Sequence, residues 1–258
     1  LLPHRVGSSL FLKITLVNRE QEFKNKNFIF INLLKDKINE RLNHNEQIIL
    51  LLNRRGFSTF ISCSNCGYTY KCPNCDISLT YHKTSNNLMC HYCGYQIKKD
   101  DLCPKCHENS LTYLGMGTEK LEQEINAIFP KAKVIRMDQD STLRKGMHEK
   151  IIQDFKEEKY NILLGTSMIS KGLDFAGVTL VGVINADTTL NIPDYRSNEN
   201  AFELLSQVSG RAGRRDKIGE VIIQTFNPNN YILKCVQNNS YTEFYKYEMN
   251  VRKELKYP

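Results

Sequence analysis

The hydrophobic and polar positions follow two periods along the chain, and their alternation predicts strands and helices in turn. Residues 14–18 read as a short strand, and the continuous apolar run at 47–52 is typical of a strand buried on both faces. Between them, residues 31–43 repeat apolar side chains at helical spacing, at Ile31, Leu34, Ile38 and Leu42.

The same alternation resumes after residue 110. Strands are expected over residues 133–138, 161–165, 178–187 and 219–226. Helices are expected over residues 117–129, with Leu121, Ile125 and Ile128 on one face, and over 146–159, 199–208 and, with weaker patterning, 229–256. Strands that alternate with helices predict an α/β fold with a parallel sheet and flanking helices.

Residues 58–110 interrupt this pattern. Cysteine, asparagine, tyrosine and lysine dominate the segment, and aliphatic residues are few. We therefore expect no apolar core of its own and another means of holding it together. The predicted division is the start of the α/β domain over 1–57, an insertion over 58–110, the rest of the domain over 111–226 and a mainly helical extension over 227–258.

The insertion carries eight of the nine cysteines, in four Cys-x-x-Cys pairs: Cys63/Cys66, Cys72/Cys75, Cys90/Cys93 and Cys103/Cys106. Each pair can present two thiolates to one tetrahedral ion, so the eight predict two structural zinc sites in a reducing cytoplasm. A nested arrangement puts the outer pairs on one zinc and the inner pairs on the other, while interleaved and sequential arrangements remain open. His91 and His107 are expected to be exposed loop residues, and Cys235 a half-buried apolar one.

A second group of residues is suited to phosphate. The stretch QVSGRAGRR contains Gln207, Arg211 and Arg214, and arginine offers a planar, permanently charged fork for phosphate oxygens. Upstream, LLGTSMISKGLDF follows a predicted strand and contains Thr166, Lys171, Gly172 and Asp174. We expect the two segments to converge at the edge of the sheet.

Together these two segments resemble motifs V and VI of superfamily 2 helicases. In that superfamily a GT…KGLDF loop, and a QxxGRxGR segment at the start of a helix, belong to the second of two RecA-like lobes. The resemblance implies that Thr166 and Lys171 face nucleic acid and that Gly172 and Asp174 line a nucleotide cleft. It also implies that Gln207, Arg211 and Arg214 point at ATP, with Arg214 as the arginine finger.

A narrower resemblance, to the PriA (primosomal protein N′) family of bacterial replication-restart helicases, covers residues 14–258. It is carried by LLNRRGFSTFISCSNCGYTYKCPNCDISLTYH, LGMGTEKLEQE, MDQDST and RSNENAFELLSQVSGRAGR. The resemblance implies the nested zinc pairing, ATP-dependent 3′-to-5′ unwinding, and binding of forked or single-stranded DNA. It also implies primosome proteins and single-stranded DNA-binding protein as partners. In this family NRRG and GTEKLEQE lie on DNA-facing or cleft-facing loops, which adds Arg54, Arg55, Thr118 and Glu119.

The sequence lacks the G-x-x-x-x-G-K-[ST] loop with which a helicase holds the phosphates of ATP and its Mg²⁺. The chain does not begin with Met, so we expect a piece of a longer enzyme that is inactive alone. We find no signal peptide and no apolar stretch long enough to span a membrane.

Two other interpretations remain. A non-enzymatic zinc-stabilised module that binds DNA or protein would explain the cysteines and the formal charge of +7, but not the two motif-like segments. The third interpretation is a decayed gene remnant.

The zinc insertion also holds five tyrosines and several lysines: Tyr68, Tyr70, Tyr81, Tyr92 and Tyr95, beside Lys71, Lys83, Lys98 and Lys99. Such a mixture suits base stacking and phosphate contact, but we expect the tyrosines to pack around the zinc turns instead. The insertion is expected to project as a rigid knob that separates strands or docks partner proteins.

Overall fold

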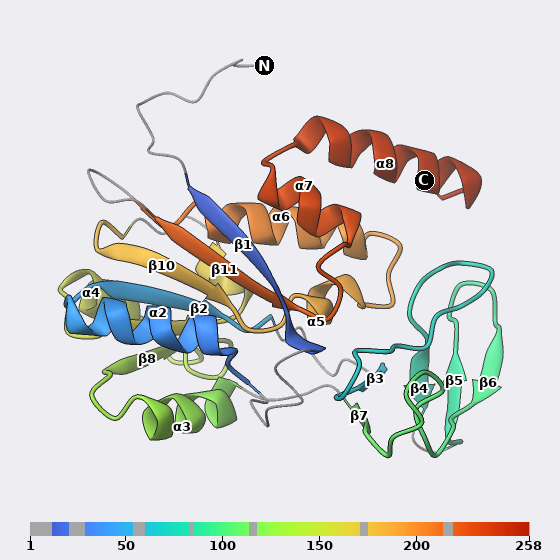
Figure 1. Ribbon diagram of the computed structural model, residues 1–258, viewed down its shortest axis with the longest axis horizontal. Coiled ribbons are helices and arrows are strands. Elements are labelled where there is room, and N and C mark those ends of the chain that lie inside the picture. The colour runs from blue at the N-terminus through green and yellow to red at the C-terminus, as the bar shows by residue number, and fades with distance from the viewer. Residues whose placement is uncertain are drawn as a thin grey trace.

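A parallel sheet of six strands forms the centre of the fold (Figure 1). The computed structural model describes residues 12–20, 29–53, 60–82, 85–113, 118–170, 175–213 and 219–257. Along the sheet the strands stand in the order β1 (Lys13–Asn18), β11 (Glu220–Thr225), β10 (Val178–Val183), β2 (Gln47–Leu51), β9 (Ile162–Gly165) and β8 (Val134–Met137). Every neighbouring pair is parallel, which confirms the fold class predicted from the alternation.

Helices cover both faces of the sheet, so its middle strands are apolar on both sides. Ile48 and Leu50 of β2 face the layer that contains α2 (Asn32–Asn43) and α3 (Thr118–Ile128). Ile49 and Leu51 face the opposite layer, which contains α4 (Met147–Lys156), α6 (Ser197–Ser209) and α7 (Tyr231–Gln237). This two-sided burial explains why residues 47–52 read as an unbroken apolar run.

Two helices differ in detail from the sequence-based expectation. Ile128 is 38% exposed, and Phe129, one position later, takes the buried place that we expected for it. The predicted helix over 229–256 is broken into α7 and α8 (Tyr241–Glu254), because the Ser240 hydroxyl accepts the Glu243 N–H and starts a new helix. None of the described helices has the length and apolar character needed to cross a membrane.

The strand expected over 178–187 is also shorter than predicted. β10 ends at Val183, and α5 (Asp187–Leu190) follows because the Asn185 side chain accepts the Asp187 N–H at 3.0 Å. A short 3₁₀ helix, η1 (Ser167–Ser170), follows β9 where no element was expected.

The cysteine-rich insertion projects to one side of the sheet (Figure 1). Its first strand, β3 (Ile61–Cys63), pairs antiparallel with its last, β7 (Leu111–Tyr113), so the segment leaves and returns at one neck. A second small sheet contains β4 (Thr80–His82), β5 (Asn87–Met89) and β6 (Gln96–Lys98).

The expectation that the insertion has no apolar core is wrong. Ile61, Ile77, Leu79 and Leu88 are buried together beside the cysteines. The cluster is small because aliphatic residues in this segment are few, so it supplements the metal sites and does not replace them.

The two sides of α2 give a first test of the layered packing. Ile38 is fully buried and Leu33, on the same helix, is 39% exposed. We expect Ile38→Ala to lower the free energy of unfolding by about 2–5 kcal/mol, because it leaves a cavity against the sheet. Leu33→Ala is the matched control, with a much smaller loss expected in urea unfolding. Equal losses from the two variants would contradict the layering.

Candidate zinc centres and phosphate-facing segments

The eight clustered cysteines form two groups of four, each suited to one metal ion. Cys63, Cys66, Cys103 and Cys106 make the first centre, and Cys72, Cys75, Cys90 and Cys93 make the second, with all Sγ atoms of a group within 4.8 Å of one another. The Sγ atoms of Cys63 and Cys106 are 3.6 Å apart, and those of Cys66 and Cys103 are 3.7 Å apart. A tetrahedral zinc with Zn–S bonds of about 2.3 Å places its sulfurs about 3.8 Å apart. The arrangement is nested, and the interleaved and sequential pairings are wrong.

All four Cys-x-x-Cys turns share one backbone pattern. The first cysteine accepts a hydrogen bond from the N–H four residues later, and donates its own N–H to the carbonyl five residues later, all at 2.8–3.0 Å. The fourth residue after each first cysteine has a positive φ, at Gly67, Asp76, Gly94 and His107. Each of these turns directs the sulfurs of its two cysteines toward one point.

The two histidines beside the cysteines are exposed, as expected, and neither completes a centre. His107 supplies a left-handed backbone conformation to its turn. The Nε2 atom of His91 lies 3.2 Å from that of His82, so these two rings contact each other. Cys235 is 3% exposed and lies in the core on the α6 side of the sheet, so it is more buried than expected.

The two centres differ in exposure. Three ligands of the first centre are buried, whereas the second includes the exposed Cys93. Burial raises the pKa of the Cys66 thiol in the first centre. Burial raises the pKa of Cys75 in the second centre as well. Each centre also has one thiol whose pKa is lowered to about 6: a hydrogen bond from the Tyr95 N–H lowers that of Cys93, and hydrogen bonds outweigh burial at Cys106. The difference between the centres is therefore one of exposure and not of ionisation. Solvent and chelators therefore reach the second centre more easily.

The first centre packs against the end of the central sheet through Phe226, the residue after β11. A Cβ atom added to Gly67 would overlap the Phe226 side chain, so only glycine fits there. The Arg19 guanidinium lies over the same ring, 5.0 Å from its centroid. The Phe226 N–H in turn donates to the buried carboxylate of Asp187 at 2.9 Å. The first zinc turn thus rests on a packed part of the sheet.

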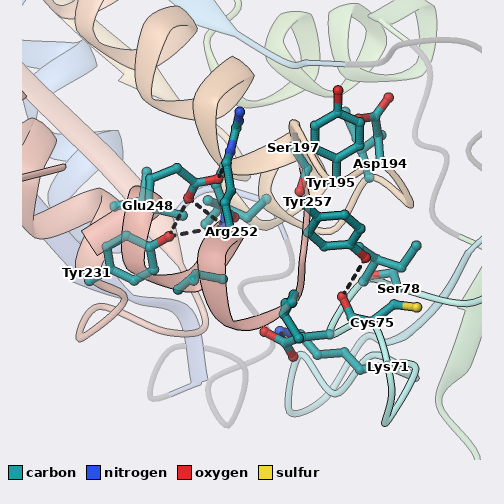
Figure 2. A pocket seen from close by; sticks show the side chains of 18 of the residues that line it. Lys71, Cys75, Ser78, Asp194, Tyr195, Ser197, Tyr231, Glu248, Arg252 and Tyr257 are labelled. Carbon is teal, nitrogen blue, oxygen red and sulfur yellow. Dashed lines mark hydrogen bonds and ion pairs between the residues drawn. The ribbon is translucent and has the colours of Figure 1, made fainter. Parts of the chain in front are cut away.

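The second centre is attached to the C-terminal segment. The Tyr257 hydroxyl donates to the Cys75 carbonyl oxygen at 3.0 Å, and Figure 2 shows the ring reaching down to that turn. Tyr257 also stacks on Tyr195, with ring centroids 5.2 Å apart, and both rings meet the edge of Tyr92 at about 6 Å. The insertion therefore contacts the rest of the molecule at each zinc centre.

Four of the five tyrosines pack around the zinc turns, as expected. Tyr70 and Tyr81 are buried in the small core, and Tyr68 and Tyr95 pack against it. Tyr92 is the exception, because its side chain is 47% exposed. The lysine of the second turn, Lys71, is paired with Asp76 at 3.0 Å. Lys98 is exposed, Lys99 donates to the Asp100 carbonyl, and Lys83 lies outside the described residues.

The two phosphate-suited segments meet through Arg211. Its Nη2 atom donates to the Ser170 carbonyl oxygen at 2.6 Å, which joins the arginine-rich stretch to η1. The half-buried Gln207 donates to Glu203 at 2.8 Å, one helical turn back. The helix expected over 199–208 is confirmed by α6, which ends at Ser209 with Gly210 as its C-cap. The start of a helix that the superfamily resemblance implied for this stretch is wrong. A helix end carries partial negative charge, so anion binding here depends on the arginine side chains.

The expectation that the two phosphate-suited segments converge at one edge of the sheet is wrong. Thr166 follows the carboxyl end of β9, and its N–H donates to the Met137 carbonyl at 3.3 Å. The Gly213 N–H instead donates to the carbonyl of Val178, the first residue of β10, at 3.0 Å. Thr166 and the arginine-rich stretch thus lie toward opposite ends of the strands, and η1 links them. The remaining predicted site residues lie outside the described ranges: Arg54, Arg55, Lys171, Gly172, Asp174 and Arg214.

The sequence analysis did not predict a group of hydrogen bonds to the buried Asp138, at the carboxyl end of β8; we call this group the Thr118–Asp138 lock. Thr118 donates to the buried Asp138 in a very short hydrogen bond, and the Ser141 N–H donates to the same carboxylate at 2.8 Å. Burial acts to raise the pKa of Asp138, but these bonds and Arg136 at 3.1 Å outweigh it and hold the pKa below its usual value. Thr118 thus joins the start of α3 to the end of β8, while Glu119 is exposed. An Asp followed three residues later by Ser is the signal that could have found it.

Comparison with known proteins assigns the class. Residues 105–216 match the family described as helicase conserved C-terminal domain, and residues 72–98 match the PriA DNA helicase Cys-rich region domain. Fold and site together define a helicase C-terminal domain that carries an inserted pair of cysteine-ligated zinc centres.

The curated relatives share one name. The replication restart protein PriA of Bacillus subtilis is 48% identical over all of this chain, which spans 32% of that protein. The PriA proteins of Synechocystis sp. and Chlamydia muridarum are 42% and 43% identical over the same extent, which is 32% and 35% of their lengths. The chain is similar to part of these PriA proteins and spans about a third of their length.

The unequal exposure predicts two zinc ions that leave at different rates. A colorimetric chelator should release one zinc per chain quickly, from the centre with Cys93, and the second slowly. Cys93→Ser should remove the fast phase and leave one tightly held zinc by elemental analysis. A single release phase, or loss of both ions in Cys93→Ser, would contradict the difference between the centres.

Two glycines with the same conformation test the contact of the first centre with the sheet. Gly67 and Gly94 have φ of +72° and +76°, but only Gly67 faces a neighbour. Alanine at either position should cost about 1–3 kcal/mol from backbone strain. Gly67→Ala should cost distinctly more than Gly94→Ala in urea unfolding, because it also displaces Phe226. Equal costs would show that the contact contributes nothing.

Proposed function

We propose that this chain is the second lobe of an ATP-dependent DNA helicase that acts in replication restart. The observation that carries the proposal is the 2.6 Å bond from Arg211 to Ser170, which brings the two helicase-like segments together. The matched helicase C-terminal domain and the name of the relatives, replication restart protein, support the same assignment.

In the proposed reaction this chain supplies positive charge to ATP that another lobe holds. Gln207 and Arg211 would contact the nucleotide, and Arg214 would neutralise charge that develops on the transferring phosphoryl group. Gly172 and Asp174 would line the cleft between the lobes. Because the sequence contains no G-x-x-x-x-G-K-[ST] loop, ATP and Mg²⁺ would be bound only when that other lobe is present.

Thr166, Lys171, Arg54 and Arg55 would hold the DNA backbone. Thr166 stands directly before η1, whose last carbonyl accepts the bond from Arg211. A nucleotide that repositions Arg211 would therefore act on η1, the short helix that directly follows Thr166. This connection would let ATP binding and hydrolysis change how tightly the lobe binds the DNA backbone.

The wider assignment follows the PriA relatives. We propose 3′-to-5′ unwinding of forked or single-stranded DNA in the cytoplasm, with primosome proteins and single-stranded DNA-binding protein as partners. The divisions 1–57, 58–110, 111–226 and 227–258 would be the first part of the lobe, the zinc insertion, the rest of the lobe and the start of a C-terminal domain. The insertion contacts the lobe at Phe226 and Tyr195 and the C-terminal part at Tyr257, and it would act as a rigid knob at the fork.

The test is fork-stimulated ATP hydrolysis by this lobe together with the ATP-binding lobe of the same protein. Arg214→Ala should reduce the rate by about 10³-fold or more, with DNA affinity and zinc content unchanged. Lys131→Ala, an exposed cation at the amino end of β8, is the control and should leave the rate unchanged.

Two results would oppose the proposal. An unchanged rate in Arg214→Ala would remove the arginine finger. Zinc-dependent DNA binding without any fork-stimulated hydrolysis by the combined lobes would favour the non-enzymatic module.

A further inference from the structure

The loop between β8 and α4 exposes an apolar side chain beside two cations. Leu143 is 76% exposed, the highest value among the large hydrophobic side chains of the described residues. Arg144 and Lys145 follow it and are also exposed, and no ion pair with a described carboxylate holds either of them. The one other exposed charge of the loop is Asp140, so the tip carries a net positive charge.

This loop is ordered by its own hydrogen bonds. The Asp138 N–H donates to the Ser141 hydroxyl at 2.9 Å, and the Thr142 hydroxyl donates to the Asp138 carbonyl at 2.7 Å. On the far side, Gly146 takes a left-handed conformation with φ of +83° and begins α4. The exposed tip therefore stands on a rigid base, which lowers the entropy cost of binding a ligand there.

The loop also adjoins the segment that carries Thr166. The Met137 carbonyl, one residue before Asp138, accepts the Thr166 N–H. The Thr142 hydroxyl lies 3.9 Å from the sulfur of Met168 in η1. Leu143, Arg144 and Lys145 thus extend the surface that begins at Thr166.

We propose that Leu143, Arg144 and Lys145 form a contact site for single-stranded DNA, which continues from Thr166. Arg144 and Lys145 bind two neighbouring phosphates, and Leu143 packs against the sugar or base between them. Two adjacent cations beside an apolar side chain match the charged phosphates and apolar bases of a single strand. The inference rests on the proposed DNA-binding function and adds three residues to it.

The experiment is fluorescence anisotropy of a labelled oligothymidylate with the 258-residue chain over a series of salt concentrations. The double variant Arg144→Gln/Lys145→Gln should lower the slope of log K against log salt by about 1.4, at about 0.7 per lost phosphate contact. Leu143→Ala should weaken binding by about three- to tenfold and leave the slope unchanged, because it removes apolar contact alone. Leu143→Tyr should restore binding by stacking on a base.

Matched controls separate the site from general charge. Lys131→Gln/Lys133→Gln removes two exposed lysines before the amino end of β8, and Leu102→Ala removes a leucine that is 50% exposed on the zinc insertion. Neither control should reproduce the effect of the corresponding loop variant. All variants change exposed side chains, so their melting temperatures and zinc content should match the parent chain.

The outcomes distinguish this inference from the function on which it rests. Binding that Thr166→Ala weakens, and that the loop variants leave unchanged, would overturn the loop site alone. An equal slope change in the lysine control, or equal competition by polyglutamate, would also overturn it, since charge alone would then explain binding. No binding by the parent chain would overturn the site and remove the DNA contact proposed for this lobe.

Discussion

Zinc–thiolate coordination at the neck of the insertion is the constraint on which the rest of the fold depends. The parallel sheet needs β2 beside β9 and β10, yet the chain leaves the sheet after Leu51 and enters it again only at β8. The first centre takes two ligands from the start of the insertion and two from its end. One ion therefore closes the whole excursion, and the entropy cost of a long loop is offset by metal binding. The second centre folds what lies inside.

Much of the fold could be predicted because packing on both faces of the sheet requires apolar residues at regular positions, and these positions can be recognised in the sequence. The run at 47–52 and the face of α2 are examples. The exchange of Ile128 for Phe129 could not be predicted, since both are apolar and only the packing against Phe30, 5.9 Å away, decides between them. The break at Ser240 depends on one side-chain cap. Spacing alone also leaves the zinc pairing open, because all four pairs have the same Cys-x-x-Cys form.

The candidate site was predicted in its residue types but not in its arrangement. Periodicity predicted that a helix ends near Gln207, and α6 does end at Ser209, whereas the helicase resemblance implied that the same stretch starts a helix. The distinction matters because a helix start attracts phosphate by itself, whereas the end of α6 leaves the arginines to supply all the positive charge. The Thr118–Asp138 lock joins residues 20 positions apart and has only a weak local signal. Polar contacts between residues far apart in the chain are the part of a site that cannot be predicted from a single sequence.

We propose that the chain is one of two lobes that share an ATP molecule, and the DNA upstream of the Leu1 codon tests this proposal most directly. Sequencing it should reveal an open frame that encodes a G-x-x-x-x-G-K-[ST] loop, which would hold the phosphates that we propose Arg211 and Arg214 contact. A stop codon directly before Leu1, or a frame without such a loop, would contradict the account and leave a zinc-stabilised lobe with no nucleotide to act on.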